Sequence, residues 1–154
     1  MASLAGYLGS EFYVTGVDAE KPTEADKIKY WREASNLGSG TKSTIEGEVV
    51  DGDGYSFFTT GKRTQKSTVL DIHKMDQASI KKLDTLFNAS GVDEVCKVWF
   101  KPTDILDWDE VETFCSMAMI TDRTERTANS SNAQGVSYEF TKSGPPIEWD
   151  GTLG

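Results

Sequence analysis

His73 is the only histidine in the chain, and its candidate partners in chemistry are Cys96 and Cys115. A histidine beside a cysteine can activate a thiolate nucleophile, and histidine together with cysteines can hold a metal ion. Either use needs several groups that converge on one point. The sequence offers no nucleophile elbow and no second histidine, so we expect His73 to lie on the surface face of a strand.

Carboxylates are concentrated in one short stretch next to a predicted strand. The stretch holds Asp104, Asp107, Asp109, Glu110 and Glu112. Paired carboxylates hydrolyse glycosidic bonds only when they face each other across a cleft, about 5 to 9 Å apart. A run of acids at the start of a strand is more typical of a solvated loop, and we interpret these residues in that way.

Two glycine-containing motifs resemble ligand-binding loops without completing them. Asp51-Gly52-Asp53-Gly54 lacks the third oxygen ligand and the distal glutamate of an EF-hand, and it matches the preferred turns of β-hairpins. Gly61-Lys62-Arg63-Thr64 resembles the end of a phosphate loop, but Ser56 replaces its first glycine and Arg63 its Ser/Thr. We therefore predict no catalytic, cofactor-binding or metal-binding residues and expect that the chain is not an enzyme.

The chain is strongly acidic. Its 154 residues carry 25 Asp and Glu against 16 Lys and Arg, a net charge of −9. Tight nucleic-acid binding needs clustered cations and is therefore not expected. Mean hydropathy is −0.46, and no apolar run approaches the roughly 18 residues of a membrane helix, so we expect no membrane contact. Residues 1–10 carry no positive charge, so we expect no secretory signal and synthesis in the cytoplasm.

The two cysteines leave two possibilities open. Cys96 and Cys115 are too few for a disulfide framework, and two buried free thiols suit a protein made in the cytoplasm. Their spacing also allows them to lie opposite each other on neighbouring antiparallel strands. A disulfide formed after release into an oxidising medium would require Cα atoms within about 7 Å. The sequence does not decide between these two states.

One segment has the pattern of an amphipathic helix, and the rest of the chain is organised around it. Asp76 is a good N-cap, and Gly91 is a suitable stop because glycine adopts positive φ at little cost. The apolar residues between them recur at helical spacing: Ile80, Leu83, Leu86 and Phe87. A helix with one narrow apolar stripe covers a neighbouring surface, so we expect this helix to lie against a sheet.

Alternating and β-branched runs predict strands along the rest of the chain. They lie at residues 11–17, 43–50, 55–60, 66–74, 94–101, 111–121 and 136–141. We expect turns at Asp51-Gly52-Asp53-Gly54 and Gly61-Lys62, and a long loop or a mobile hairpin tip over residues 122–135. Residues 27–36 fit a short helix or a strand equally well. Strand 111–121 is apolar on both faces, which predicts a core on one side and a helix or a neighbouring subunit on the other.

These elements sum to six or seven strands and one helix, without a repeat or a linker. We expect residues 1–154 to form a single, mainly β domain with extended N-terminal and C-terminal segments. The economical architecture is an antiparallel β-sandwich or barrel with one flanking amphipathic α-helix. Trp149 leaves an aromatic side chain in the tail, which we expect to dock on a neighbour.

The order of these elements and their residue patterns resemble those of the family of bacteriophage major tail tube proteins, which are related to the tubes of contractile secretion systems. The resemblance covers most of residues 11–146 and lies in element order rather than in one diagnostic motif. The segments that carry it are Tyr30-Trp31, Phe58-Thr59-Thr60-Gly61, Thr68-Val69-Leu70-Asp71-Ile72, Leu83 with Leu86-Phe87, Val98-Trp99-Phe100 and Ser143-Gly144-Pro145-Pro146.

This resemblance implies a structural subunit of the virion tail, with no catalytic residues to carry over. Six subunits would form a ring whose inner sheets join into one barrel, and stacked rings would form a tube that conducts DNA without binding it specifically. A long loop near residues 38–62 would reach the adjacent ring. The implied partners are other copies of the chain, together with sheath, tape-measure and tail-terminator proteins.

The residues themselves are compatible with a tube and also with a different class of protein. Ring closure removes exposed sheet edges, and an acidic lumen lets DNA pass without adhesion. The alternative is a monomeric small β-barrel that binds an apolar ligand among its Phe, Trp and Tyr side chains. A third interpretation, an enzyme, rests on His73 and the acidic run alone.

Overall fold

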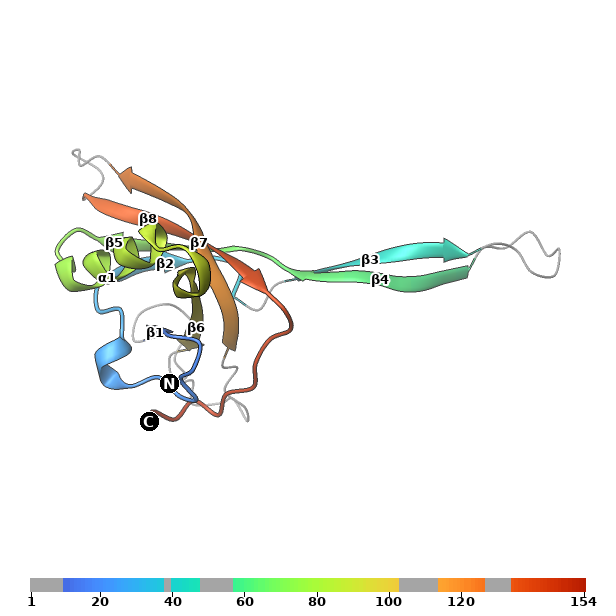
Figure 1. Cartoon of the computed structure of the whole chain (residues 1–154), viewed down its shortest axis with the longest axis horizontal. Helices are drawn as coiled ribbons and strands as arrows, with labels where there is room; N and C mark the ends of the chain where they lie inside the picture. The colour runs from blue at the N-terminus through green and yellow to red at the C-terminus, as the bar shows by residue number, and fades with distance from the viewer. Residues whose placement is uncertain (1–9, 38–39, 48–56, 103–113, 127–133) are drawn as a thin grey trace, which may run out of the picture.

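The computed structural model describes residues 10–37, 40–47, 57–102, 114–126 and 134–154 (Figure 1). Within them the fold is mainly β, with antiparallel sheets and one α-helix, as the sequence predicts. In chain order the elements are β1 (Glu11–Thr15), the 3-10 helix η1 (Glu24–Asp26), β2 (Trp31–Ala34), β3 (Gly40–Gly47), β4 (Phe57–Gln65), β5 (Thr68–His73), α1 (Gln77–Asn88), the 3-10 helix η2 (Gly91–Glu94), β6 (Val95–Lys101), β7 (Phe114–Arg126) and β8 (Gly135–Ser143).

The body of the molecule is one antiparallel sheet that curls towards closure. Its strand order is β1-β6-β7-β8-β5-β2. The two ends of the sheet meet because Tyr13 of β1 forms a bridge with Lys27, and the Ile28 N–H donates to the Phe12 carbonyl at 2.8 Å. Three residues later the same segment becomes β2 and pairs with β5. The result is a small, partly closed barrel, in which the chain before β2 covers the edge of β1.

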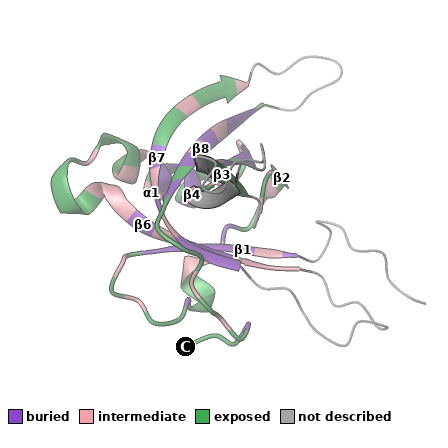
Figure 2. Ribbon diagram, turned by 90° about the vertical axis from the view of Figure 1, so that its right-hand side faces the viewer, coloured by how far each residue is buried: buried purple, intermediate pink, exposed green. Residues whose placement is uncertain are grey.

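Alternate side chains of the strands point into the barrel and fill its interior. Phe12 contacts both Trp31 and Phe140, with ring centroids 6.3 and 6.2 Å apart. Buried residues accordingly follow the strands of the body (Figure 2). The largest buried members of this core, apart from the rings just named, are Ile28, Leu70, Ile72, Leu83, Val14, Val98, Val136 and Tyr138. Val98 of β6, Val136, Tyr138 and Phe140 of β8, and also Phe114, Ala118 and Ile120 of β7, confirm the period of two predicted for these strands.

Helix α1 flanks the barrel, and its N-terminus is fixed by the predicted cap. Asp76 accepts the Ser79 N–H at 3.2 Å, and its other oxygen accepts the Lys29 N–H at 3.1 Å. Ile80 and Leu83 are buried against the sheet, whereas Phe87 is 37% exposed, so its predicted place in the buried stripe is wrong. The helix ends at Asn88, before the predicted stop, and Gly91 opens η2 with φ of 72°. No helix in the described residues is long and apolar enough to cross a membrane.

Several predicted boundaries change in the structure. Residues 27–36 contain a strand, β2, which settles the open choice between strand and helix. The turn predicted at Gly61-Lys62 is wrong, because β4 runs through both residues to Gln65. β7 continues to Arg126, so the predicted loop begins later than residue 122. The turn at Asp51-Gly52-Asp53-Gly54 and the acids of residues 104–112 lie outside the described residues.

A second, smaller apolar cluster lies on the outer face of the barrel. Tyr13, Trp99 and Cys115 are buried there beneath the C-terminal tail. Trp149 of the tail packs edge-on against Trp99 and Tyr13, with ring centroids 5.4 and 6.1 Å apart. The Ile147 N–H also donates to the Cys115 carbonyl at 2.8 Å. Trp149 therefore docks on its own chain, which corrects the expectation that it docks on a neighbour.

Both cysteines are free thiols. Cys96 pairs with Ala118 across β6 and β7, while Cys115 pairs with Trp99, so the two are not opposite each other. Cys96 belongs to the interior core and Cys115 to the outer cluster, so their side chains point to opposite faces of the sheet. Burial raises the pKa of the Cys96 thiol to about 12 and that of Cys115 to about 11, which suppresses thiolate chemistry.

Candidate assembly surfaces

The fold keeps apart the residues that were candidates for a common catalytic or metal-binding site. His73 ends β5, and its Nδ1 accepts the Met75 N–H at 3.1 Å. Cys96 and Cys115 lie on β6 and β7, and β8 separates β5 from β7 in the sheet. Gly61-Lys62-Arg63-Thr64 lies inside strand β4 rather than before a helix, which rules out a phosphate loop. Among the described residues, no group of three or more His, Cys, Asp or Glu is placed to hold a metal ion.

A buried carboxylate of the sheet, Asp71, is paired with two arginines. Asp71 of β5 is 8% exposed and pairs with Arg126 of β7. The Arg32 Nε of β2 lies 3.2 Å from its other oxygen. These two ion pairs link strands that are not neighbours in sequence, so Asp71 joins β5 to β2 and β7.

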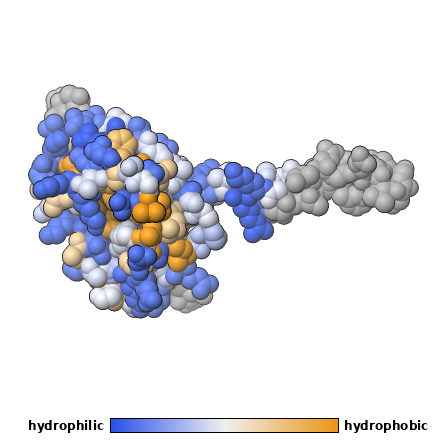
Figure 3. Space-filling model, viewed as in Figure 1, coloured by the Kyte–Doolittle hydropathy of each residue, from blue (hydrophilic) through white to orange (hydrophobic). Residues whose placement is uncertain are grey.

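The most prominent surface of the molecule is an arm formed by β3 and β4. Their register runs from Gly40 opposite Gln65 to Gly47 opposite Phe57, with a bulge between Lys42 and Thr44. In Figure 1 the arm extends far from the body, and no other described element lies beside it. Its described residues nearest the body are mainly hydrophilic (Figure 3). Such a two-stranded ribbon offers free backbone groups on both edges and is marginally stable alone in water.

The arm is continuous with the body rather than joined to it by a loose linker. Only Lys66 and Ser67 separate β4 from β5. At this junction the Gln65 Nε2 donates to the Ser116 Oγ at 2.8 Å and to the Gly144 carbonyl at 2.7 Å. These contacts fasten the arm to β7 and to the segment after β8. These two hydrogen bonds therefore fix the direction in which the arm leaves the body.

A buried lysine supports the other strand of the arm. Lys142 of β8 is 7% exposed, and its Nζ donates to the Asn36 carbonyl at 2.9 Å. The same ammonium lies 4.2 Å from the centroid of the Phe114 ring. Asn36 sits between β2 and β3 with φ of 53°, and its side chain donates to the Ser67 carbonyl at 3.2 Å. Burial lowers the pKa of Lys142 to about 8.

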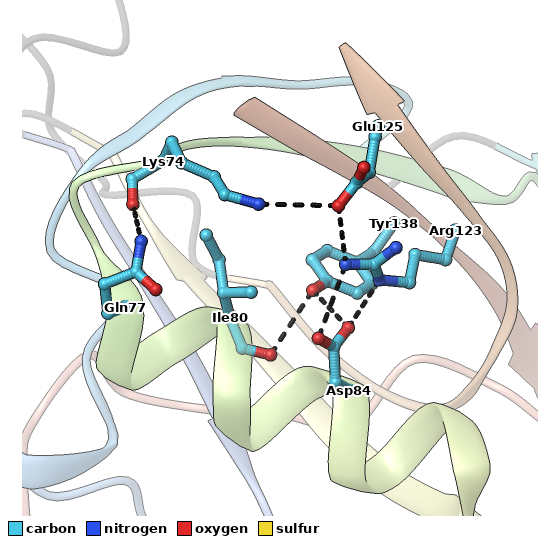
Figure 4. Close-up of polar contacts among 7 residues, drawn as sticks. All are labelled: Lys74, Gln77, Ile80, Asp84, Arg123, Glu125 and Tyr138. Atoms are coloured by element: carbon cyan, nitrogen blue, oxygen red, sulfur yellow. Dashed lines mark hydrogen bonds and ion pairs between the residues drawn. The ribbon is translucent and has the colours of Figure 1, made fainter. Parts of the chain in front are cut away.

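A polar network fastens α1 to the sheet (Figure 4). The Arg123 Nε of β7 donates to the Asp84 Oδ1 at 2.6 Å, and the Tyr138 hydroxyl donates to the same oxygen at 2.7 Å. Arg123 also reaches Glu125 at 3.3 Å, and Glu125 lies 3.4 Å from the Lys74 Nζ. The hydrogen bond to Asp84 raises the pKa of Arg123, so the guanidinium stays charged. Every group is paired, and the network positions the helix.

The outer face of β6 and β7 is mostly apolar beyond the part that the tail covers, with Lys97 as a charged exception. Past Trp99 and Cys115, the cross-strand pairs are Lys97 with Met117 and Val95 with Met119. Val95 and both methionines are only half-buried. This agrees with the prediction that β7 is apolar on both faces, since the tail covers one part of the outer face and leaves the rest accessible to a partner.

The surfaces with a clear geometric role are thus the arm, its base and the apolar outer face of β6 and β7. Sequence reasoning placed the hairpin but missed the Asp84–Arg123 link, the Lys142 support and the tail contact. In comparisons with known proteins, no family model matches the chain and no curated protein matches it.

Proposed function

We propose that this chain is a structural subunit that self-assembles into stacked hexameric rings, forming the tube of a bacteriophage tail through which DNA passes. The observation that carries the proposal is the arm. β3 and β4 stand away from the body as an isolated two-stranded ribbon, whose long, exposed edges need a partner to be stable. A second copy of the chain supplies that partner in an assembly.

The body supplies further support for an assembly. The half-buried apolar face of β6 and β7 continues past the tail, as a subunit interface would require. A net charge of −9 suits a lumen through which DNA moves without adhering. In this proposal the protein acts in the virion tail and is made in the host cytoplasm. Sheath, tape-measure and tail-terminator proteins are its further partners, and catalysis is not part of its function.

The alternative, a monomeric barrel that encloses an apolar ligand, has less support. The aromatic side chains that would line its pocket contact one another instead, since Trp31 packs against both Phe12 and Phe100 at 6.3 and 6.2 Å. A ligand-binding barrel also has no use for a long projecting ribbon.

The test is negative-stain electron microscopy and sedimentation velocity of the purified protein over a concentration series. We expect rings or tubes with a central hole at high concentration. Featureless monomers throughout, with a melting temperature raised by an apolar ligand, would instead favour the binding barrel.

An arm-deleted variant sharpens this test. Gly40 and Gln65 are cross-strand partners, so residues 41–64 can be replaced by a two-residue Asn-Gly turn without disturbing the contacts of Gln65. We expect this variant to keep the fold of the body, measured by circular dichroism, and to lose stacking into tubes. Normal tubes from the arm-deleted variant would contradict the role given to the arm.

A further inference from the structure

Two cations face each other at the base of the arm. Lys42 of β3 and Arg63 of β4 are direct cross-strand partners, and both are exposed. Directly opposite residues of an antiparallel pair have Cβ atoms about 5 Å apart, and like charges at that position destabilise the pair. Neither side chain forms an ion pair with any residue that the structure describes. Among the described residues, nothing therefore compensates this repulsion.

The charged residues around the Lys42–Arg63 pair are also mainly positive. Lys62 and Lys66 are exposed in the same part of β4 and just after it, and Glu46 is the one acidic residue in the described part of the arm. This part is cationic in a chain whose net charge is −9. The opposite charge needed to neutralise the pair is thus abundant on other copies of the chain.

A groove lies beside the pair. It has a volume of about 500 Å³ and lies between the base of the arm and the segment after β8, with Lys42, Arg63, Gln65, Gly144 and Pro145 among its lining residues. The two hydrogen bonds of the Gln65 Nε2, to the Ser116 Oγ and the Gly144 carbonyl, hold this side of the groove in place.

We propose that this groove is the docking site for an extended, carboxylate-bearing segment of a second copy of the chain. A carboxylate of that segment bridges Lys42 and Arg63, which removes the repulsion between the two cations. The docking rests on the assembly function proposed above and assigns its partner chemistry. Nucleic-acid phosphate is the less favoured ligand, because a few cations on an acidic chain retain DNA poorly.

The central experiment reverses the two charges. In Lys42→Glu/Arg63→Glu the pair repels a carboxylate, and we expect the protein concentration for half-assembly to rise by about tenfold or more. The matched control is Lys29→Glu/Lys81→Glu, which changes net charge equally at two exposed lysines of the body that form no ion pair among the described residues. We expect the control to stay within about twofold of the wild type, because only its long-range charge differs. Equal effects in both variants, or none in either, would overturn the proposal.

A neutral variant tests the mechanism through salt. Lys42→Thr/Arg63→Thr keeps strand propensity and removes the repulsion, so we expect it to fold normally and to assemble more weakly than the wild type. Raising the ionic strength weakens wild-type assembly, because salt screens the exposed charges, and this dependence is reduced in the neutral variant. An unchanged salt dependence contradicts a docking site built on charge.

Zero-length crosslinking separates this proposal from the proposed function. A carbodiimide condenses an ammonium with a contacting carboxylate, with loss of water, and mass spectrometry of mixed isotope-labelled chains identifies links between copies. Tubes without an interchain link at Lys42 would refute the docking site while leaving the tube intact. If no tubes form, the proposed function is refuted. A crosslink between copies in concentrated solution still tests the docking site in that case. A gel shift of double-stranded DNA that depends on Arg63 would assign the groove to nucleic acid.

Discussion

Asp84 of α1 and Arg123 of β7 form an ion pair in which the Arg123 Nε lies 2.6 Å from the Asp84 Oδ1. The two residues are 39 positions apart, and both side chains are less than one third exposed. The Tyr138 hydroxyl donates to the same carboxylate oxygen, so one acid joins the helix to two strands. This pair joins α1 to the barrel together with other polar contacts, such as that of the Lys82 Nζ with the Val14 carbonyl.

We expect Asp84→Ala to destabilise the protein by about 1–2 kcal/mol, because it leaves the Arg123 guanidinium and the Tyr138 hydroxyl short of an acceptor. Urea denaturation measures this change in the free energy of unfolding. A double-mutant cycle with Arg123→Ala should give a coupling of about 1 kcal/mol. Glu24→Ala is the control, since Glu24 is 73% exposed in its ion pair with Lys27 and should change stability by less than about 0.5 kcal/mol. A coupling near zero would show that the pair does not hold the helix.

Charged substitutions at Leu83 and Phe87 of α1 should differ in their cost to stability, because only Leu83 is fully buried. Leu83→Asp places a charge in the core at a fully buried position, so we expect a loss of about 4 kcal/mol or more, or failure to fold. Phe87→Asp introduces the same charge at a position that is 37% exposed, and we expect a loss of about 1 kcal/mol or less. Thermal and urea denaturation of both variants measure the difference. Equal losses would place Phe87 in the core, contrary to the structure.

The buried ammonium of Lys142 should give stability a distinct dependence on pH. Burial lowers its pKa in the folded protein from 10.5 to about 8, so the unfolded chain binds more protons between these values. Stability therefore rises with pH in this window, as the folded protein releases its proton first, and the penalty is fully present below pH 8.

Lys142→Met isolates this contribution, because methionine is apolar and cannot titrate. We expect the free energy of unfolding of the wild type, relative to the variant, to increase between about pH 8 and 10. Urea denaturation of both proteins across this range measures the difference. A constant difference across the range would show that the ammonium is not desolvated.

The fold class was predictable because it depends on local patterns. Alternation placed the strands of the body, and Asp76 marked the start of the helix through its capping geometry. The Gly61-Lys62 turn failed because both residues lie within β4 where its register with β3 shifts, and glycine in a strand marks such an irregularity as readily as a turn. Cross-strand pairing is a tertiary interaction, and a local signal does not contain it.

The surfaces were less predictable for a related reason. The contact of Asp84 with Arg123 and that of Trp149 with Tyr13 join residues far apart in sequence, and no spacing rule brings them together. The Lys42–Arg63 pair likewise depends on the register of β3 and β4, which includes a bulge. A shift by one residue would have moved each side chain to the other face of the arm.

The continuity of β4 with β5 has a mechanical consequence. In Figure 1 the arm runs on from β5 in nearly the same direction, and β5 is held by an antiparallel ladder that pairs Thr68–His73 with Gly135–Phe140. Tension applied along the arm therefore loads these hydrogen bonds together, in shear, instead of peeling them apart one after another. Because β5 lies between β8 and β2, the load spreads into the sheet from a paired strand. Along β4 the arm can thus transmit a pulling force to a strand that is paired on both sides, whereas β3 follows the edge strand β2.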